Sequence, residues 1–224
     1  MYLLPLLTTV LFRTALAHTW NEQLSVIESG SFVGGNGYPR GYVSRTIPGF
    51  SNNIMKYQLP PPEDTSRTRV NDSDFLCAPT QKAPNQTQGF PRLSAWPGAY
   101  MAMKYLENGH VTLPQNTPGK PVGGGTVFVF GTSQPIENEL LVDVLEWTTD
   151  STGGDRRGKL VTAQNFDDGR YYQINAGNIS LTRQQEFPDP VEGQPRSVHE
   201  QWCETDVAIP SDVSINSTYT VYWV

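Results

Sequence analysis

The chain is poor in the residues that build most metal and nucleic-acid sites. Its 224 residues include two cysteines and three histidines, which leaves no cluster that offers a tetrahedral zinc site its four ligands. Basic residues are also few, since 16 Lys and Arg stand against 22 Asp and Glu for a formal net charge of −6. This balance argues against a protein that binds nucleic acid or an anionic membrane surface.

Long apolar runs are absent except at the start of the chain. The run from Tyr2 to Phe12 is followed by Ala15 and Ala17, the small-x-small pattern behind which signal peptidase cuts. We therefore expect residues 1–17 to be a signal peptide and residues 18–224 to form a single secreted, extracellular domain without a membrane span. Arg13 lies after the apolar run instead of before it, so a retained signal anchor is the alternative. Cleavage would remove Arg13 and change the formal net charge from −6 to −7.

Two further features fit an oxidising, secretory compartment. Cys77 and Cys203 are compatible with one disulfide bond that closes a long loop, and a pair of free buried thiols is the alternative. Asn-x-Ser/Thr acceptor sequences for N-glycosylation, which favour surface loops, begin at Asn71, Asn85, Asn178 and Asn216.

The composition predicts an all-β fold. With 20 Gly and 18 Pro in 224 residues, the chain is interrupted every few positions, which leaves little room for long helices. Short apolar segments rich in β-branched and aromatic residues predict strands at Glu22–Ile27, Gly98–Leu106, Thr126–Phe130, Lys159–Thr162, Tyr171–Ile174, Asp206–Ile209 and Tyr219–Val224. Short strands with long irregular connections favour an antiparallel β-sandwich over a doubly wound sheet.

The longest connection runs from Glu28 to Arg92. A stretch of that length inside a domain is either functional or contains short elements that the sequence pattern does not reveal. Its aromatic and cationic residues form a candidate face for a sugar surface, with ordinary packing of the loop as the alternative; they are Tyr38, Arg40, Tyr42 and Arg45.

Three polar segments are interpreted as structural. Gly153–Lys159 lacks the spacing of a phosphate-binding loop and is expected to be a solvated turn. Asn165–Gly169 contains adjacent carboxylates, which suit a tight turn better than the paired carboxylates of a glycoside hydrolase. Weak calcium binding by Asp155 or Asp168 stays open, although no EF-hand spacing exists. His199 is expected to be a surface histidine near Cys203.

The strongest functional signal comes from His18 and His110. Cleavage after Ala17 would make His18 the first residue, so that its α-amino nitrogen and its ring nitrogen can both hold one metal ion. His110 follows the turn dipeptide Asn108-Gly109 just beyond a predicted strand, which is a common way to present a binding residue. Two imidazoles and an amine give a T-shaped set of nitrogen donors, which favours Cu(II).

In these features the chain resembles the lytic polysaccharide monooxygenases of fungi, which are copper enzymes with a histidine brace. It is more closely similar to a secreted fungal family related to those enzymes. The matching segments are His18-Thr19-Trp20, Gly37–Tyr42, Glu107–Gln115, Gly153–Lys159 and Asn165–Gly169.

The resemblance implies an immunoglobulin-like or fibronectin-like antiparallel β-sandwich with a flat surface that carries copper. His18 and His110 would be both the metal ligands and the catalytic residues, and copper would be the cofactor. The reduced metal would activate oxygen or peroxide for hydrogen abstraction at a glycosidic carbon. The implied partners are a polysaccharide surface (cellulose, chitin or hemicellulose) and an external electron donor, and a monomer is expected.

The chain departs from the monooxygenase pattern at its C-terminal end. In those enzymes a Tyr or Phe on the last strand occupies the axial position of the copper, whereas Tyr219–Val224 resembles the strand before it. The sequence is therefore expected to be truncated, and the resemblance leaves open that Cys77 pairs with a cysteine of the missing strand. A copper-binding protein of the same fold without catalysis, and a cell-wall or adhesion module in which both histidines are incidental, are the alternatives.

Overall fold

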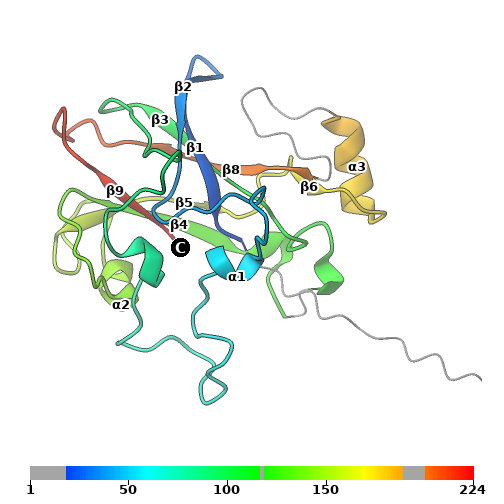
Figure 1. The fold of residues 1–224 in the computed structure, drawn as a ribbon, viewed down its shortest axis with the longest axis horizontal. Helices are drawn as coiled ribbons and strands as arrows, with labels where there is room; N and C mark the ends of the chain where they lie inside the picture. Colours follow the sequence, from blue (N-terminus) through cyan, green and yellow to red (C-terminus); the bar gives the residue numbers. More distant parts are fainter. Residues whose placement is uncertain (1–18, 117–118, 189–199) are drawn as a thin grey trace, which may run out of the picture.

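Two antiparallel sheets form the framework of the protein (Figure 1). The computed structural model describes residues 19–116, 119–188 and 200–224, so the predicted signal peptide, His18 and His199 lie outside the described residues. The larger sheet has the strand order β2-β1-β3-β8, and the smaller sheet has the order β5-β4-β9. A third pairing joins the short strands β6 and β7. Strands hold 27% of the described residues and helices 14%, which agrees with the predicted all-β class.

The elements have the following bounds. The larger sheet contains β1 (Asn21–Glu28), β2 (Ser31–Gly37), β3 (Tyr100–Tyr105) and β8 (Cys203–Ala208). The smaller sheet contains β4 (Thr126–Thr132), β5 (Gly158–Asn165) and β9 (Thr220–Trp223), and the ribbon contains β6 (Tyr172–Gln173) and β7 (Glu200–Gln201). The α-helices are α1 (Asn52–Met55), α2 (Leu141–Leu145) and α3 (Asn178–Glu186), and 3-10 turns occur at Pro79–Gln81, Pro114–Asn116 and Val122–Gly124.

The two sheets share one core. Alternation along β3 points Met101, Met103 and Tyr105 inward, where all are buried. Val127 and Val129 of β4 belong to the same cluster, so apolar side chains of both sheets pack against each other. Full burial of each such side chain stabilises the fold by roughly 1.5–3 kcal/mol. This arrangement is consistent with a β-sandwich.

All seven predicted strands coincide with observed strands, although β8 begins at Cys203 instead of Asp206 and β6 is shorter than predicted. The sequence pattern missed β2, because Gly34-Gly35-Asn36-Gly37 has the composition of a turn. Pairing with β1 holds this segment extended. Gly37 is required there, since a Cβ at that position would lie 2.3 Å from the backbone nitrogen of Leu93.

The long connection packs on the protein instead of presenting a sugar-binding face. Tyr42 is buried with Trp20, and the Arg45 guanidinium lies 4.2 Å from the centre of the Trp20 ring. Arg45 also forms an ion pair of 2.5 Å with the buried Glu22 carboxylate. Arg40 donates to the Thr220 hydroxyl at 3.0 Å. The alternative interpretation, ordinary loop packing, is therefore the one that the structure shows.

Gly153–Lys159 is more than the solvated turn that the sequence predicted. The Trp147 indole donates to Asp155 at 2.9 Å, and Arg157 forms an ion pair with the buried Glu139 carboxylate. Gly158 lies so close to Trp147 that a Cβ there would meet its ring at 2.2 Å. These contacts fasten the segment onto the second apolar cluster of the protein.

The predicted disulfide bond between Cys77 and Cys203 is wrong for this structure, in which both thiols are free. Cys203 is fully buried between the sheets with Met103 and Tyr105, whereas Cys77 packs on a separate cluster that contains Trp147. The two cysteines therefore belong to different parts of the packed interior. Burial raises the pKa of Cys77 to about 11 and also raises that of Cys203, which keeps both thiols protonated at neutral pH.

The structure also bears on the predicted glycosylation sites and on the expected lack of a membrane span. The asparagines of all four glycosylation sequences are exposed, and their glycosylation stays a prediction; they are Asn71, Asn85, Asn178 and Asn216. None of the helices in the described part of the chain has the length and apolar character that crossing a bilayer requires.

The free thiols give a direct test of the cysteine assignment. Because no cross-link constrains the unfolded chain, we expect a reductant to leave the melting temperature unchanged. Alkylation of the unfolded protein without reductant should add two labels, one on each cysteine, as measured by intact mass. A mass without labels, together with a melting temperature that falls by several degrees in reductant, would show that the two cysteines form a disulfide bond after all.

Candidate functional site around His110

The His110 loop leaves the larger sheet beside the first described residue of the chain. Asn21 of β1 pairs with Tyr105, the last residue of β3. Thr19 lies two residues before Asn21, where β1 begins. Its hydroxyl donates a hydrogen bond of 2.5 Å to the Leu106 carbonyl. The antiparallel pairing of β1 and β3 therefore brings Thr19 to the start of the loop that carries His110.

A tight turn positions His110 itself. Asn108 and Gly109 adopt positive φ angles of 50° and 80°, and the His110 amide donates to the Glu107 carbonyl at 3.1 Å. The predicted turn at Asn108-Gly109 is thus confirmed. The expected exposed imidazole is not, because His110 is only 8% exposed. Its ring packs against Phe166 at a centroid distance of 5.5 Å, and Nδ1 lies 3.2 Å from Lys120 Nζ.

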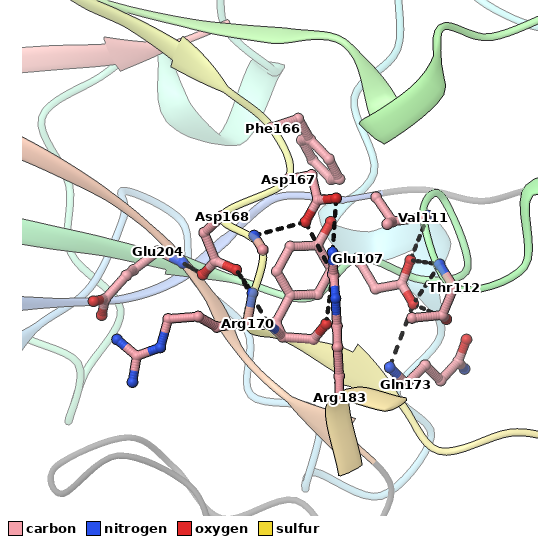
Figure 2. Close-up of polar contacts among 12 residues, drawn as sticks. Glu107, Val111, Thr112, Phe166, Asp167, Asp168, Arg170, Gln173, Arg183 and Glu204 are labelled. Atoms are coloured by element: carbon pink, nitrogen blue, oxygen red, sulfur yellow. Dashed lines mark hydrogen bonds and ion pairs between the residues drawn. The ribbon is translucent and has the colours of Figure 1, made fainter. Parts of the chain in front are cut away.

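The Glu107 carboxylate holds the loop from inside (Figure 2). It is fully buried and accepts hydrogen bonds from the backbone amides of Val111 at 2.6 Å and Thr112 at 3.1 Å. It also accepts hydrogen bonds from the Thr112 hydroxyl and, at 3.3 Å, from the backbone amide of Gln173. The second of these bonds joins the loop to β6. A buried carboxylate with this many donors is a strong local constraint on the backbone around His110.

Phe166 fixes the other side of the imidazole. The residue follows β5, and its carbonyl accepts a hydrogen bond of 2.6 Å from the Tyr105 hydroxyl. Gly124 lies against the phenyl ring of Phe166, since a Cβ at Gly124 would be 2.5 Å from Phe166 Cδ1. Gly124 also has a φ of 78°, a conformation that glycine adopts without steric cost.

Asp167 and Asp168 take part in structural contacts, as the turn interpretation predicted. Asp167 forms a two-point ion pair with Arg183 of α3, with both distances at 2.9 Å. Asp168 accepts from the backbone amides of Arg170, Tyr171 and Glu204, at 2.8, 3.1 and 3.1 Å (Figure 2). Asp155 is likewise used by Trp147 and Arg157, so neither Asp155 nor Asp168 presents an open carboxylate for calcium.

An acidic groove of about 330 Å³ lies beside this turn. Its lining includes Asp167, Asp168, Glu204 and Asp206, with Arg170 as the cation among them. Burial is the main cause that raises the pKa values of Asp168, Glu204 and Asp206, and their mutual repulsion adds to it. The ionised carboxylates therefore destabilise this edge of the fold at neutral pH.

Within the described ranges, no group of three or more His, Cys, Asp or Glu side chains can hold a metal ion. His110 is the one predicted ligand that the described structure includes, and its expected partner, His18, lies outside it. Sequence reasoning missed Glu107, Lys120 and Phe166 as neighbours of His110. A glutamate directly before Asn108-Gly109 was an available signal for Glu107, because its carboxylate can reach the amides that follow a turn.

A protein-family model matches residues 15–224 of the chain. The chain belongs to the family described as a domain of unknown function, DUF7492. No curated protein and no solved structure matches the chain. The DUF7492 match covers both predicted copper ligands, His18 and His110.

In this DUF7492 domain, Glu107→Gln tests whether the buried carboxylate holds the loop. The amide has one acceptor oxygen instead of two and places an N–H among N–H donors. We expect the free energy of unfolding to fall by about 2–4 kcal/mol, measured by urea denaturation. Glu186→Gln, which changes an exposed glutamate at the end of α3, is the matched control and should stay within about 0.5 kcal/mol of the wild type. Equal stability of both variants would show that Glu107 does not constrain the loop.

The acidic groove gives a prediction about pH. A carboxylate whose pKa is raised in the folded state binds its proton more tightly there, so it adds stability as pH falls from neutrality through the folded-state pKa. Asp206→Asn removes a charge that repels Glu204, so we expect a higher melting temperature than the wild type at pH 7.5. The difference should shrink as pH falls, because the carboxylates take up protons in the folded state. A difference that does not change with pH would refute the electrostatic explanation.

Proposed function

We propose that the protein is a secreted copper-binding protein of the lytic polysaccharide monooxygenase type, with His18 and His110 as the copper ligands. The observation that carries the proposal is the hydrogen bond of 2.5 Å between Thr19 and Leu106. Thr19 directly follows His18 in the chain, and consecutive Cα atoms are about 3.8 Å apart. His110 follows Leu106 by one tight turn. The fold thus brings the residue that follows His18 to the start of the loop that carries His110, which supports the proposed pair of ligands.

The donors fit copper better than zinc. Signal cleavage after Ala17 would give His18 a free amine, so the amine and two imidazoles supply three nitrogen donors, which suit the tetragonal preference of Cu(II). Nδ1 of His110 faces Lys120, so we assign Nε2 as its metal-binding nitrogen. Copper that cycles between Cu(II) and Cu(I) would supply the chemistry for activating oxygen or peroxide and oxidising a glycosidic carbon.

The residues of the chain would orient and enclose the metal ligand. Glu107 fixes the backbone of the loop, and Phe166 packs on the His110 ring, so the imidazole has little freedom to rotate. In the monooxygenases an aromatic residue of the last strand lies beside the metal, and the strand that would carry it was expected to be missing from this chain. We propose instead that Phe166, which follows β5, is that aromatic residue.

The finer fold assignment belongs to the same proposal. Sheets of four and three antiparallel strands over a shared core support an immunoglobulin-like or fibronectin-like sandwich. The site would lie at the end of this sandwich where β1 begins and β3 ends. A polysaccharide surface and an external electron donor would be the partners of the copper site.

A copper-binding protein without catalysis is the second candidate. The observation that favours it is the burial of His110, which is 8% exposed. Oxidation of a polysaccharide requires access of the substrate to the metal, whereas capture of copper does not. A His110 side chain covered by Phe166 and Lys120 suits a metal that is held away from a large substrate.

Copper titration distinguishes both copper proposals from an incidental pair of histidines. Protein that begins at His18, verified by intact mass, should bind one Cu(II) tightly and give an axial electron paramagnetic resonance spectrum. One extra residue before His18 removes the amine donor, and His110→Ala removes an imidazole. Each change should weaken copper binding by on the order of 100-fold or more. His199→Ala is the matched control and should bind as the wild type does; equal affinity in all four proteins would refute the site.

Product analysis then separates the enzyme from the binder. Copper-loaded protein with ascorbate should release oxidised oligosaccharides from cellulose, chitin or xylan, and His110→Ala should release none. Tight copper binding without oxidised products from any of the three polymers would support the non-catalytic candidate.

A further inference from the structure

A second cavity lies at the opposite end of the smaller sheet from Phe166. Its volume is about 200 Å³, and it forms where β4 ends and β5 begins, beside the approach to β9. Thr126 at the start of β4 pairs with Asn165, next to Phe166, whereas Thr132 at its end pairs with Gly158 at the cavity. The cavity therefore lies beside the start of β9, at the opposite end of β4 from Phe166; β9 begins at the left in Figure 1. Nothing in the copper proposal depends on it.

Tyr219 contributes a buried polar atom to this cavity. Its hydroxyl is shielded from solvent and has no hydrogen-bond partner within the described part of the chain. The ring packs on Gly131, where a Cβ would lie 2.3 Å from the hydroxyl oxygen. Burial raises the pKa of Tyr219 to about 12, so the phenol stays neutral and able to donate. Buried donors are usually satisfied, and this one has no accessible surface, so a ligand in the cavity would reach it only after a small shift of the Tyr219 side chain.

Arg156 is the second residue at this cavity whose side chain has no internal hydrogen-bond partner among the described residues. The residue is exposed, lines the cavity, and has a φ of 62°, a left-handed conformation that is uncommon for a long side chain. Its backbone amide donates to the Gly153 carbonyl at 3.3 Å, but its guanidinium has no hydrogen-bond or ion-pair partner among the described residues. The adjacent Arg157 is a contrast, because Glu139, Asp155 and the Gln134 carbonyl use its donors. Strained residues without an internal role concentrate at functional sites.

The remaining lining adds positive charge and hydroxyl groups. Lys159 lies 3.8 Å from Asp212, at the long end of an ion pair, and the Asp212 side chain is 80% exposed. Lys159 therefore keeps donors for another acceptor. Ser133 and Ser151 bring hydroxyl groups to the same cavity. Apart from Arg157, whose charge is matched by its own partners, the lining has two cations against the single carboxylate of Asp212.

We propose that this cavity binds a small oxyanion ligand, held by Arg156 with support from Lys159 and the Tyr219 hydroxyl. The planar guanidinium of arginine matches two oxygens of a carboxylate or a sulfate group, and the ammonium of lysine adds a point charge. A uronic acid and a sulfate ester both present this chemistry. The ligand would be recognised by its oxyanion, so a neutral sugar of the same size would not bind.

Calorimetric titration with sodium glucuronate and with sodium sulfate at constant ionic strength tests the proposal, and glucose is the neutral control. We expect binding of at least one of the two anions and none of glucose. Glucuronate alone would identify a carboxylate ligand, sulfate alone would identify a sulfate ligand, and both would support a general oxyanion site. Absence of binding by either anion, or equal binding of glucose, would overturn the proposal.

Arg156→Gly separates binding from folding. Glycine adopts a φ of 62° without strain, so the melting temperature should not fall, while anion affinity should drop by about tenfold or more. Tyr219→Phe keeps the ring on Gly131 and should weaken binding by about fivefold. Arg69→Gly, at an exposed position outside the cavity, is the matched charge control and should bind as the wild type does. Unchanged affinity in Arg156→Gly would show an adventitious ion only.

Discussion

The pairing of β1 with β3 is the constraint on which the rest of the structure depends. It aligns Asn21 with Tyr105 and Ile27 with Tyr100 along nearly the whole length of both strands. The same pairing directs the inner face of β3 onto the smaller sheet, where Met101, Met103 and Tyr105 meet Val127 and Val129. It also sets the distance between the start of the described chain and the His110 loop. A shift of one residue in this register would turn the core side chains outward and separate Thr19 from Leu106.

Buried carboxylates order the loops, as backbone pairing orders the sheets. Glu22 holds Arg45, Glu139 holds Arg157, and Glu107 holds the amides after the His110 turn. All three carboxylates are 1–2% exposed, and each links segments that lie apart in the sequence or turns back on its own loop. A chain with many Gly and Pro has few regular elements to order its long connections, so hydrogen bonds to buried charges supply the order. Loss of one partner would leave an uncompensated charge in the interior.

The two candidate sites differ in what the fold gives them. At one end, the His110 imidazole is enclosed by Phe166 and fixed by its loop, which suits a rigid metal ligand. At the other end, the Arg156 guanidinium and the Tyr219 hydroxyl have no internal partners among the described residues, which suits an external ligand. The sheet β5-β4-β9 extends from one to the other, since β4 begins beside Phe166 and ends at the cavity.

The sequence by itself determined the class of the fold, the seven main strands and the turn at Asn108-Gly109, because alternation and turn chemistry are local properties. It did not reveal β2, which has the composition of a turn and is extended only because β1 pairs with it. It also predicted a disulfide bond between cysteines that tertiary packing assigns to separate clusters. The burial of His110 and the packing of Phe166 on it were decided by the tertiary structure alone, because Phe166 follows β5 and His110 follows β3, and no local pattern relates the two residues.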